Sequence, residues 1–147
     1  MITVRKVLVN EIEALREFYK ECSSFRINNG SEFIVAFKNN QPLGFAKIAL
    51  KRNIAEIIMI YVNPKERGQG LGDAILRTTL NCIEKYGYLW VLTSDNPHLN
   101  HFFIKEGFIL LEDVIDFEDF KCSIEKYNPS DTYCCKIPEF FQKGCRK

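Results

Sequence analysis

The sequence predicts an α/β (α+β) domain with one central sheet and three layers. Two observations indicate this class: apolar runs of strand length alternate with segments of helical periodicity, and a glycine-rich turn joins one such strand to one such helix. A third observation concerns organisation. No linker rich in Pro or Ser, no internal repeat and no low-complexity run divides the 147 residues. We therefore expect a single domain over residues 1–147, long enough to bury a sizeable core.

The N-terminal part of the chain predicts a short strand followed by a helix. Ile2–Val7 has strand composition, and Asn10 can cap the helix, with Glu13 completing a capping-box pattern three residues later. The helix has apolar residues at helical spacing, and these predict one buried face: Ile12, Leu15, Phe18 and Tyr19.

Three further strands are predicted in the middle of the chain. Glu32–Lys38 and Leu43–Lys51 have strand composition and flank the turn sequence Asn39–Pro42, so they should form a hairpin. Ile54–Val62 is apolar on both faces apart from Glu56, and this composition is typical of a strand inside a sheet.

The C-terminal half of the sequence predicts further helices and strands in alternation. The helix after the glycines should bury a broad face made of Leu71, Ala74, Ile75, Cys82, Ile83 and Tyr86. Tyr88–Thr93 reads as a buried strand, and a helix should follow it from Asn96–Pro97 to Glu106. Gly107 should end that helix, ahead of strands at Phe108–Leu111 and Tyr133–Ile137.

Composition excludes several classes of function. The net charge is +1 and 27% of residues are charged, so no strong field favours nucleic acid or an acidic membrane surface. The longest unbroken apolar run, Ile57–Val62, is too short to span a bilayer. The N-terminal residues lack an apolar signal core before acidic residues appear. We expect a cytoplasmic protein that binds neither nucleic acid nor membrane.

The six cysteines do not form a C-x-x-C pair. They stand at Cys22, Cys82, Cys122, Cys134, Cys135 and Cys145. Adjacent residues of a strand point to opposite faces, so Cys134 and Cys135 should not share a metal ion. Reduced, structural thiols are the expectation and no metal site is predicted. A redox or metal role for Cys134, Cys135 and Cys145 is the alternative, which zinc in the purified protein would support.

The glycine-rich turn indicates a ligand that carries phosphate. A helix N-terminus has unpaired N–H groups and a partial positive charge, which suit a phosphate. Gly70 and Gly72 have no side chains to block the approach of such a ligand. The glycines at 68, 70 and 72 fit neither a Walker sequence nor the GxGxxG spacing. A diphosphate ligand is therefore predicted here, and a purely structural turn is the alternative.

The same segment carries a family resemblance. Val62, Pro64, Arg67, Gly68, Gly70 and Gly72 spell V-x-P-x-x-R-G-x-G-x-G. This resembles the GNAT superfamily of acyl-CoA N-acyltransferases, whose core signature is [Q/R]-x-x-G-x-[G/A] between a strand and a helix. The resemblance extends from about Glu32 to Gly107. It implies a mixed sheet of six or seven strands, splayed at the fourth strand, Ile54–Val62, with helices on both faces.

The resemblance also implies acetyl-CoA as acyl donor and a set of contacts to it. The pantetheine arm would pair with the backbone of Ile60, Tyr61 and Val62, and a neighbouring N–H would polarise the thioester carbonyl. The pyrophosphate would take N–H groups from Arg67, Gly68, Gln69, Gly70, Leu71, Gly72 and Asp73. Transfer in this family is direct attack by an amine held beside the thioester.

Glu56 is the candidate general base. It lies eleven residues before Arg67, the spacing at which histone-type members of the superfamily place their catalytic glutamate. An amine with a pKa of about 10.4 costs roughly 4–5 kcal/mol to deprotonate at neutral pH, against about 2 kcal/mol for a thiol near 8.5, so the base matters more than the acid. An apolar strand should raise the pKa of Glu56 by desolvation. The alternative is a Glu that organises water or pairs with a basic side chain.

The segment that carries the general acid in many family members departs from their pattern, which is N-x-x-A-x-x-x-Y-x-x-x-G-F. The corresponding positions of this sequence are Asn96, Leu99, Phe103, Gly107 and Phe108. Phe103 stands at the tyrosine position and cannot protonate the CoA thiolate. Asn96 and Phe103 are carried over as cofactor contacts, and Asn96 can at the same time cap its helix. Which group serves as the acid stays open.

The acceptor is not predicted. In this fold, Cys22–Gly30 and Ile115–Tyr133 would shape its pocket. The acidic residues Asp116, Glu118 and Asp119 fit either a cationic amine or a solvated loop. Two functions remain: an N-acetyltransferase acting on a primary amine of a small molecule or protein, and a CoA-binding regulatory or toxin-neutralising domain without turnover. The protein is expected to be a monomer or a homodimer.

Overall fold

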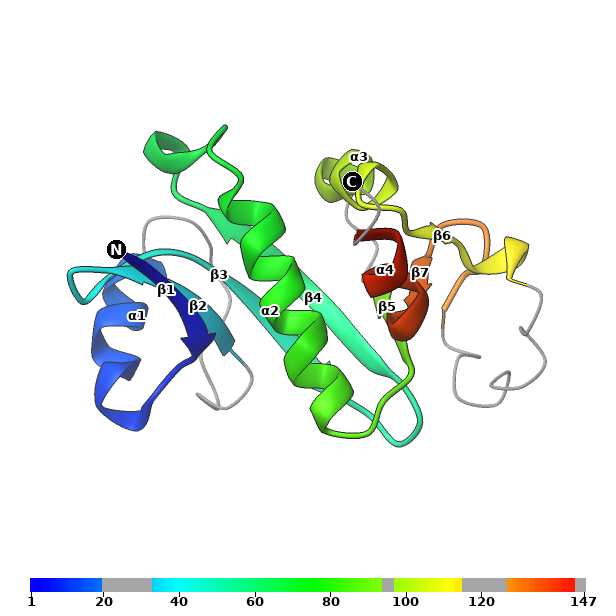
Figure 1. Cartoon of the computed structure of the whole chain (residues 1–147), viewed down its shortest axis with the longest axis horizontal. Helices are drawn as coiled ribbons and strands as arrows, with labels where there is room; N and C mark the ends of the chain where they lie inside the picture. Colours follow the sequence, from blue (N-terminus) through cyan, green and yellow to red (C-terminus); the bar gives the residue numbers. More distant parts are fainter. Residues whose placement is uncertain (20–32, 94–96, 115–126, 145–147) are drawn as a thin grey trace. The chain divides into compact units, whose positions relative to one another are not determined.

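A computed structural model of the chain describes residues 1–19, 33–93, 97–114 and 127–144 (Figure 1). The strands form one seven-stranded sheet in the order β1-β2-β3-β4-β5-β7-β6. Antiparallel pairs and one parallel pair, β4 with β5, make the sheet mixed. This confirms the predicted class and strand number. The described residues fall into two compact units, Met1–Ile48 with Ile60–Thr79, and Ala49–Met59 with Leu80–Lys147.

The first unit begins with a three-stranded antiparallel meander: β1 (Ile2–Lys6), β2 (Phe33–Lys38) and β3 (Gln41–Leu50). The predicted hairpin is confirmed, with a turn at Asn39 and Asn40, which have φ of +53° and +65°. Asparagine tolerates this left-handed region better than most residues. Strand β3 starts at Gln41, earlier than predicted, and takes in Pro42 near a register shift between Ala36 and Phe37.

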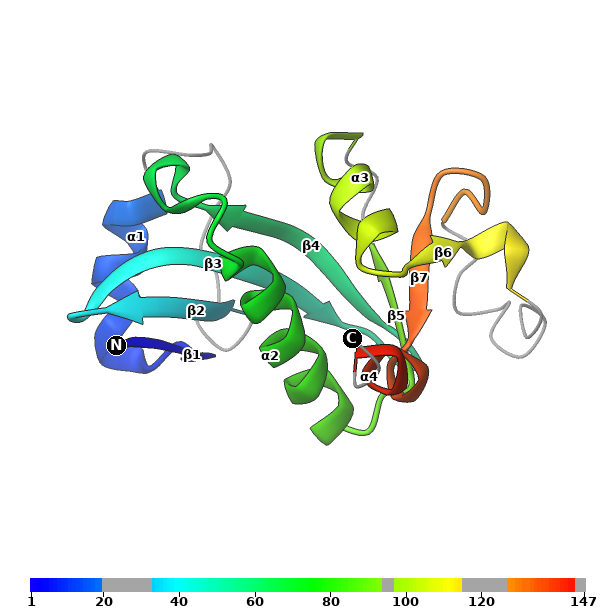
Figure 2. The same ribbon diagram turned by 45° about the horizontal axis from the view of Figure 1, so that its top comes forward.

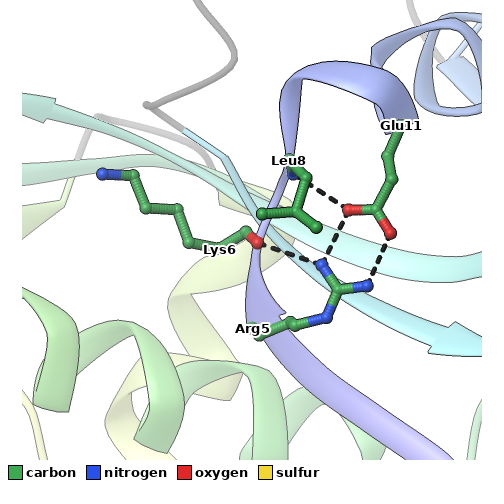
Figure 3. A network of polar contacts seen from close by, with 4 residues as sticks. All are labelled: Arg5, Lys6, Leu8 and Glu11. Carbon is green, nitrogen blue, oxygen red and sulfur yellow. Dashed lines mark hydrogen bonds and ion pairs between the residues drawn. The ribbon is translucent and has the colours of Figure 1, made fainter.

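The helix after β1 starts differently from the prediction. A 3₁₀ turn, Val9–Glu11, precedes α1 (Ile12–Tyr19), so Asn10 lies inside the turn and does not cap a helix. The cap instead comes from Glu11, whose Oε1 accepts the Leu8 N–H at 2.9 Å. The same oxygen accepts a hydrogen bond from Arg5 Nη1 at 2.7 Å (Figure 3). The predicted capping pattern of Asn10 and Glu13 is therefore wrong, because Glu11, held by Arg5 six residues earlier in the chain, provides the cap instead.

Helices cover both faces of the sheet in the first unit. Phe18 of α1 contacts Phe45 and Tyr61, with ring centroids 6.1 and 5.7 Å apart. A Cβ built on the adjacent Gly44 would lie 3.1 Å from Ile75 Cδ1 of α2 (Leu71–Lys85). Successive strand residues face opposite sides, so α1 packs on one face and α2 on the other (Figure 2). This confirms helices on both faces there.

The buried face of α2 differs in part from the predicted one. Its buried residues are Leu71, Ile75, Leu76, Thr79, Leu80 and Ile83. Tyr86 follows the end of α2 and is 45% exposed, so its assignment to this face is wrong. The helix stops one residue before Tyr86, whose N–H donates to the carbonyls of Cys82 and Ile83 in the closing turn.

The second unit is built around the paired part of β4 (Ala55–Val62). It pairs in parallel with β5 (Trp90–Thr93) from Ala55 to Ile57, and β4 continues beyond that ladder to Val62. The last strand, β7 (Tyr133–Lys136), lies between β5 and β6 (Ile109–Leu110) and is antiparallel to both. A core cluster joins these strands: Ile54, Leu92, Leu111, Val114 and Cys134.

Two helices complete the second unit. Helix α3 (Pro97–Lys105) begins at the proline, as predicted, and is followed by Gly107 with φ of +99°. Helix α4 (Ile137–Gly144) was not predicted, and β7 ends at Lys136 because Ile137 begins this helix. Pro138 lies in its first turn, where a missing N–H costs no intrahelical bond. Among the described residues, no helix combines the length and apolar character needed to cross a membrane.

Candidate active site

The glycine-rich segment lies between the end of β4 and the start of α2. A 3₁₀ turn, Pro64–Glu66, opens it, and the Asn63 side chain accepts the Lys65 N–H at 3.1 Å. Gly68 and Gly70 then have φ of +82° and +78°. Side chains disfavour this region, which explains two glycines here.

The backbone of this segment is open to an approaching ligand and leads into a helix N-terminus. A Cβ added at Gly68 or Gly70 would meet no described heavy atom within 4 Å. The first hydrogen bond of α2 runs from the Ala74 N–H to the Gly70 carbonyl at 3.1 Å. The N–H groups of Leu71–Asp73 precede that bond and are the ones that a helix N-terminus presents to an anion. Gly72 lies in this first helical turn.

Asp73 places a carboxylate in the same turn. Its Oδ2 accepts a hydrogen bond from Arg77 Nε at 3.0 Å, one turn further along α2. Its Oδ1 is buried and has no hydrogen-bond partner among the described residues. Arg77 thus compensates a negative charge that would otherwise oppose a phosphate at this helix end.

The end of β4 is covered by an arginine from the loop. Ile60 is buried, whereas Tyr61 and Val62 are half-buried. Arg67 Nε donates to the Val62 carbonyl at 2.9 Å, and its guanidinium lies 5.6 Å from the Tyr61 ring centroid. The Arg67 side chain therefore contacts two of the three β4 residues at which the family resemblance implies a pantetheine arm.

Gly44 is a positioning residue that the sequence analysis missed. A Cβ at this position would lie 2.6 Å from the Tyr61 carbonyl oxygen and 3.2 Å from Val62 Cα. Strand β3 can approach this end of β4 so closely only because residue 44 has no side chain. A glycine inside a predicted strand is the signal that could have found it.

Glu56 lies in a polar cluster with two residues that the sequence analysis did not select. Its side chain is 12% exposed, and its Oε1 lies 2.9 Å from Lys51 Nζ. The Tyr127 hydroxyl donates to the same oxygen at 2.6 Å and accepts a hydrogen bond from Lys51 Nζ, also at 2.6 Å. We call Lys51, Glu56 and Tyr127 the glutamate cluster.

The glutamate cluster changes the expected environment of Glu56. The sequence predicted a carboxylate desolvated by an apolar strand, but an ammonium and a phenol hydroxyl contact it. Both contacts stabilise the ionised carboxylate. Pairing with a basic side chain was the alternative considered for Glu56, and such a pair is present. Lys51 precedes Glu56 by five residues, whereas Tyr127 lies 71 residues away and no local pattern indicates it.

Phe103 is a core residue. It is 2% exposed, and its ring centroid lies 4.9 Å from that of Phe108 and 5.4 Å from that of Phe102. A phenylalanine at this position therefore fills apolar space inside the second unit. Its contact with a cofactor stays a prediction.

Several predicted residues lie outside the described part of the chain. These are Asn96, the acceptor segment Cys22–Gly30, residues 115–126 of the second acceptor segment with its acidic residues, and Cys22, Cys122 and Cys145. Of the remaining cysteines, Cys134 and Cys135 are buried and Cys82 is half-buried, and these three are not joined in disulfides. Within residues that the structure describes, no three His, Cys, Asp or Glu side chains are grouped to hold a metal ion.

Comparison with solved structures shows the fold. The chain superposes on the PaiA N-acetyltransferase of Thermoplasma acidophilum in complex with coenzyme A with a TM-score of 0.65, at 20% identity over 92% of this chain and 99% of that one. It also matches the ribosomal-protein-S18-alanine N-acetyltransferase of Escherichia coli with a TM-score of 0.60, at 20% identity over 74% of this chain and 78% of that one.

A third similar structure is the N-acetylglutamate synthase of Neisseria gonorrhoeae complexed with coenzyme A and L-arginine. The TM-score is 0.68 at 16% identity, over 92% of this chain and 33% of that one. The chain therefore spans about a third of that enzyme's length. A comparison with curated proteins returned no match.

The family model described as "Acetyltransferase (GNAT) domain" matches residues 29–110. That range covers more than half of the 147 residues and includes β4, the glycine-rich segment and α2. The chain belongs to the GNAT acetyltransferase domain family.

Proposed function

We propose that this protein transfers an acetyl group from acetyl-CoA to a primary amine of a small molecule or a protein. The observation that carries the proposal is the segment Arg67–Asp73, where two left-handed glycines and open space precede a helix N-terminus. Two of the similar structures are complexes with coenzyme A, and this supports the same ligand here. We further propose that residues 1–147 act as one catalytic domain.

The ligand contacts follow from the same elements. The diphosphate would take backbone N–H groups from Arg67, Gly68, Gln69, Gly70, Leu71, Gly72 and Asp73. The pantetheine arm would pair with the backbone of Ile60, Tyr61 and Val62. Because Arg67 Nε already donates to the Val62 carbonyl, Arg67 would hold the end of β4 in place beside the ligand.

The chemistry requires one proton acceptor and one leaving thiol. Acetyl-CoA supplies a thioester whose carbon–sulfur bond breaks as the amine nitrogen bonds to the acetyl carbon. We assign to Glu56 the proton lost by the amine, because deprotonating an ammonium costs roughly 4–5 kcal/mol at neutral pH. Expelling a thiolate costs only about 2 kcal/mol, so Phe103 in place of a tyrosine is compatible with turnover.

Binding can be tested at the glycine-rich segment by calorimetric titration with acetyl-CoA. We expect Gly70→Glu to weaken binding about 100-fold or more, because its carboxylate would enter the phosphate site. The matched control is Gly87→Glu, at another glycine with positive φ (+97°) and open space around it. Both variants carry the same backbone strain and charge, so only Gly70→Glu should lose affinity. Unchanged binding by Gly70→Glu would refute the phosphate site.

Turnover can be tested with a panel of amines by following release of the free CoA thiol. We expect the wild-type protein to release thiol with at least one primary amine. Glu56→Gln should lower kcat about 100-fold or more while leaving acetyl-CoA affinity unchanged, because a general base contributes roughly 10²–10⁴ in rate. Full activity of Glu56→Gln would show that another group accepts the proton.

A CoA-binding domain without turnover is the second candidate. One observation favours it: Phe103, at the place of the family's acid, is buried in an apolar core and has no hydroxyl. Tight binding of acetyl-CoA without thiol release on any small amine or peptide amine would favour this candidate over the transferase.

A further inference from the structure

The glutamate cluster is closed by three mutual contacts. Lys51 Nζ lies 2.9 Å from Glu56 Oε1 and 2.6 Å from the Tyr127 hydroxyl oxygen, and that hydroxyl lies 2.6 Å from the same Oε1. Lys51 Nζ also lies 4.9 Å from the centroid of the Tyr127 ring. Each member therefore contacts the other two.

Lys51 and Tyr127 are each held by groups outside the cluster. The Lys51 N–H donates to the Ile54 carbonyl at 3.0 Å, and the Tyr88 hydroxyl donates to the Lys51 carbonyl. Tyr127 packs against the apolar cluster that includes Ile54 and Leu92. The cluster is thus fixed by the backbone on one side and by core packing on the other.

The charges of the cluster favour one protonation pattern. The pKa of Lys51 is raised by its hydrogen bonds to Glu56 and Tyr127. The pKa of Tyr127 is raised by burial and by the hydrogen bond to Glu56. At neutral pH, Lys51 is therefore an ammonium and Tyr127 a neutral donor. On β5, the residue paired with Glu56 is the apolar Leu92.

We propose that Lys51 and Tyr127 are positioning residues that keep the carboxylate of Glu56 ionised and fixed, so that it can accept a proton at neutral and mildly acidic pH. This rests on the proposed function, in which Glu56 accepts the proton of the amine. The proposal assigns roles to Lys51 and Tyr127, which come from the two separate chain segments of the second unit, and neither the fold nor the glycine-rich segment implies these roles.

The proposal can be tested without turnover by ¹³C NMR titration of the protein labelled at Glu side-chain carboxyls. Loss of one resonance in Glu56→Gln assigns Glu56. We expect Lys51→Met to move the titration midpoint of Glu56 up by about one pH unit, because an adjacent ammonium favours the ionised form. Tyr127→Phe should move it in the same direction by less. Midpoints equal to wild type in both variants would overturn the proposal.

Two controls show whether the midpoint of Glu56 responds to the adjacent cation or only to the net charge of the protein. Lys51→Arg keeps a cation beside Glu56 and should keep the midpoint near the wild-type value. Lys85→Met removes one exposed lysine at the end of α2 and should also leave the midpoint unchanged. An equal shift in Lys85→Met would show an effect of net charge and would count against the proposal. If Lys51→Met does not fold, Lys51→Gln removes the same charge with a polar side chain and should raise the midpoint in the same way. An unchanged midpoint in Lys51→Gln and Tyr127→Phe would overturn the proposal.

A kinetic test uses the pH dependence of kcat/KM. The acid limb of this profile, where activity falls as Glu56 is protonated, should move to higher pH in Tyr127→Phe and Lys51→Met, as the NMR midpoints do. It should stay in place in Lys51→Arg. A shifted midpoint with an unmoved acid limb would overturn the role in proton acceptance. Absence of thiol release by the wild-type protein with every amine would instead refute the proposed function, which the NMR titration does not depend on.

Discussion

Glu11 and Glu56 are both bound by a cation, but the origin of their partners differs. Glu11 takes its hydrogen bonds from Arg5 and from the Leu8 N–H, all within six residues of it in the chain. Glu56 takes one of its bonds from Tyr127, 71 residues away. The carboxylate of Glu11 therefore stabilises a local turn. The hydrogen bond between Glu56 and Tyr127 forms only when distant segments of the chain have folded together.

Replacing Glu11 by Gln should lower the free energy of unfolding by about 1 kcal/mol at neutral pH, since it weakens an ion pair and a cap. Arg5 is 37% exposed, so solvent screening limits the effect. The hydrogen bond from Arg5 lowers the pKa of Glu11 in the folded state. The stabilisation is thus present above the unfolded pKa of about 4.3 and is lost as pH falls through the folded value.

Urea unfolding at neutral pH and in acid measures this difference. The gap between wild type and Glu11→Gln should shrink toward zero in acid. Glu13→Gln is the matched control, because Glu13 contacts Arg16 only at 3.5 Å and is 74% exposed. An equally large decrease in the free energy of unfolding in Glu13→Gln would contradict the role given to Glu11.

Cys134 should be protected from alkylation. Burial raises the pKa of this thiol to about 12, so at about pH 8 only about one molecule in 10⁴ carries the thiolate that reacts. We expect iodoacetamide to label Cys134 about a thousand times more slowly in the folded protein than in urea, as followed by mass spectrometry of its peptide. Equal rates in both conditions would show that β7 opens readily.

Strand β3 approaches the end of β4 closely at Gly44. Gly44 faces the Tyr61 carbonyl on one side of the strand, and the adjacent Phe45 packs against Phe18 on the other. The strand therefore packs a helix on one face and determines on the other how near the end of β4 can lie.

Gly44→Ala should destabilise the protein by about 2–3 kcal/mol, because its Cβ would overlap backbone that cannot move alone. Displacing Tyr61 and Val62 should also weaken acetyl-CoA binding. Thermal unfolding and calorimetric titration measure the two effects. Gly87→Ala, which meets no atom within 4 Å, should cost only about 1 kcal/mol of backbone strain and no affinity. Full stability of Gly44→Ala would contradict the close approach.

Across the chain, local sequence patterns predicted most strands and helices correctly. The hairpin at Asn39–Asn40, the glycine-rich turn and the proline start of α3 each depend on conformations that particular residues favour within a few positions. The same reason explains why the glycine-rich segment could be proposed as a phosphate site from residues 62–72 alone. What such patterns cannot contain is a partner from elsewhere in the chain.

Two of the missing features have that origin. Tyr127, which contacts Glu56, lies 71 residues from it in the chain, and only the fold brings Tyr61 against Gly44. The wrong cap has a local origin, because Glu11 and Arg5 lie in the same short segment as Asn10 and compete with it.

The insertion of β7 between β5 and β6 has a consequence for synthesis on the ribosome. Strands β5 and β6 are made before β7 but do not pair with each other in the final sheet order. Their facing edges stay open until residues 133–136 have left the exit tunnel, so the nascent chain exposes strand edges prone to aggregation. A chain truncated before Tyr133 should therefore recruit chaperones or precipitate, and pelleting assays of ribosome-released fragments would show it.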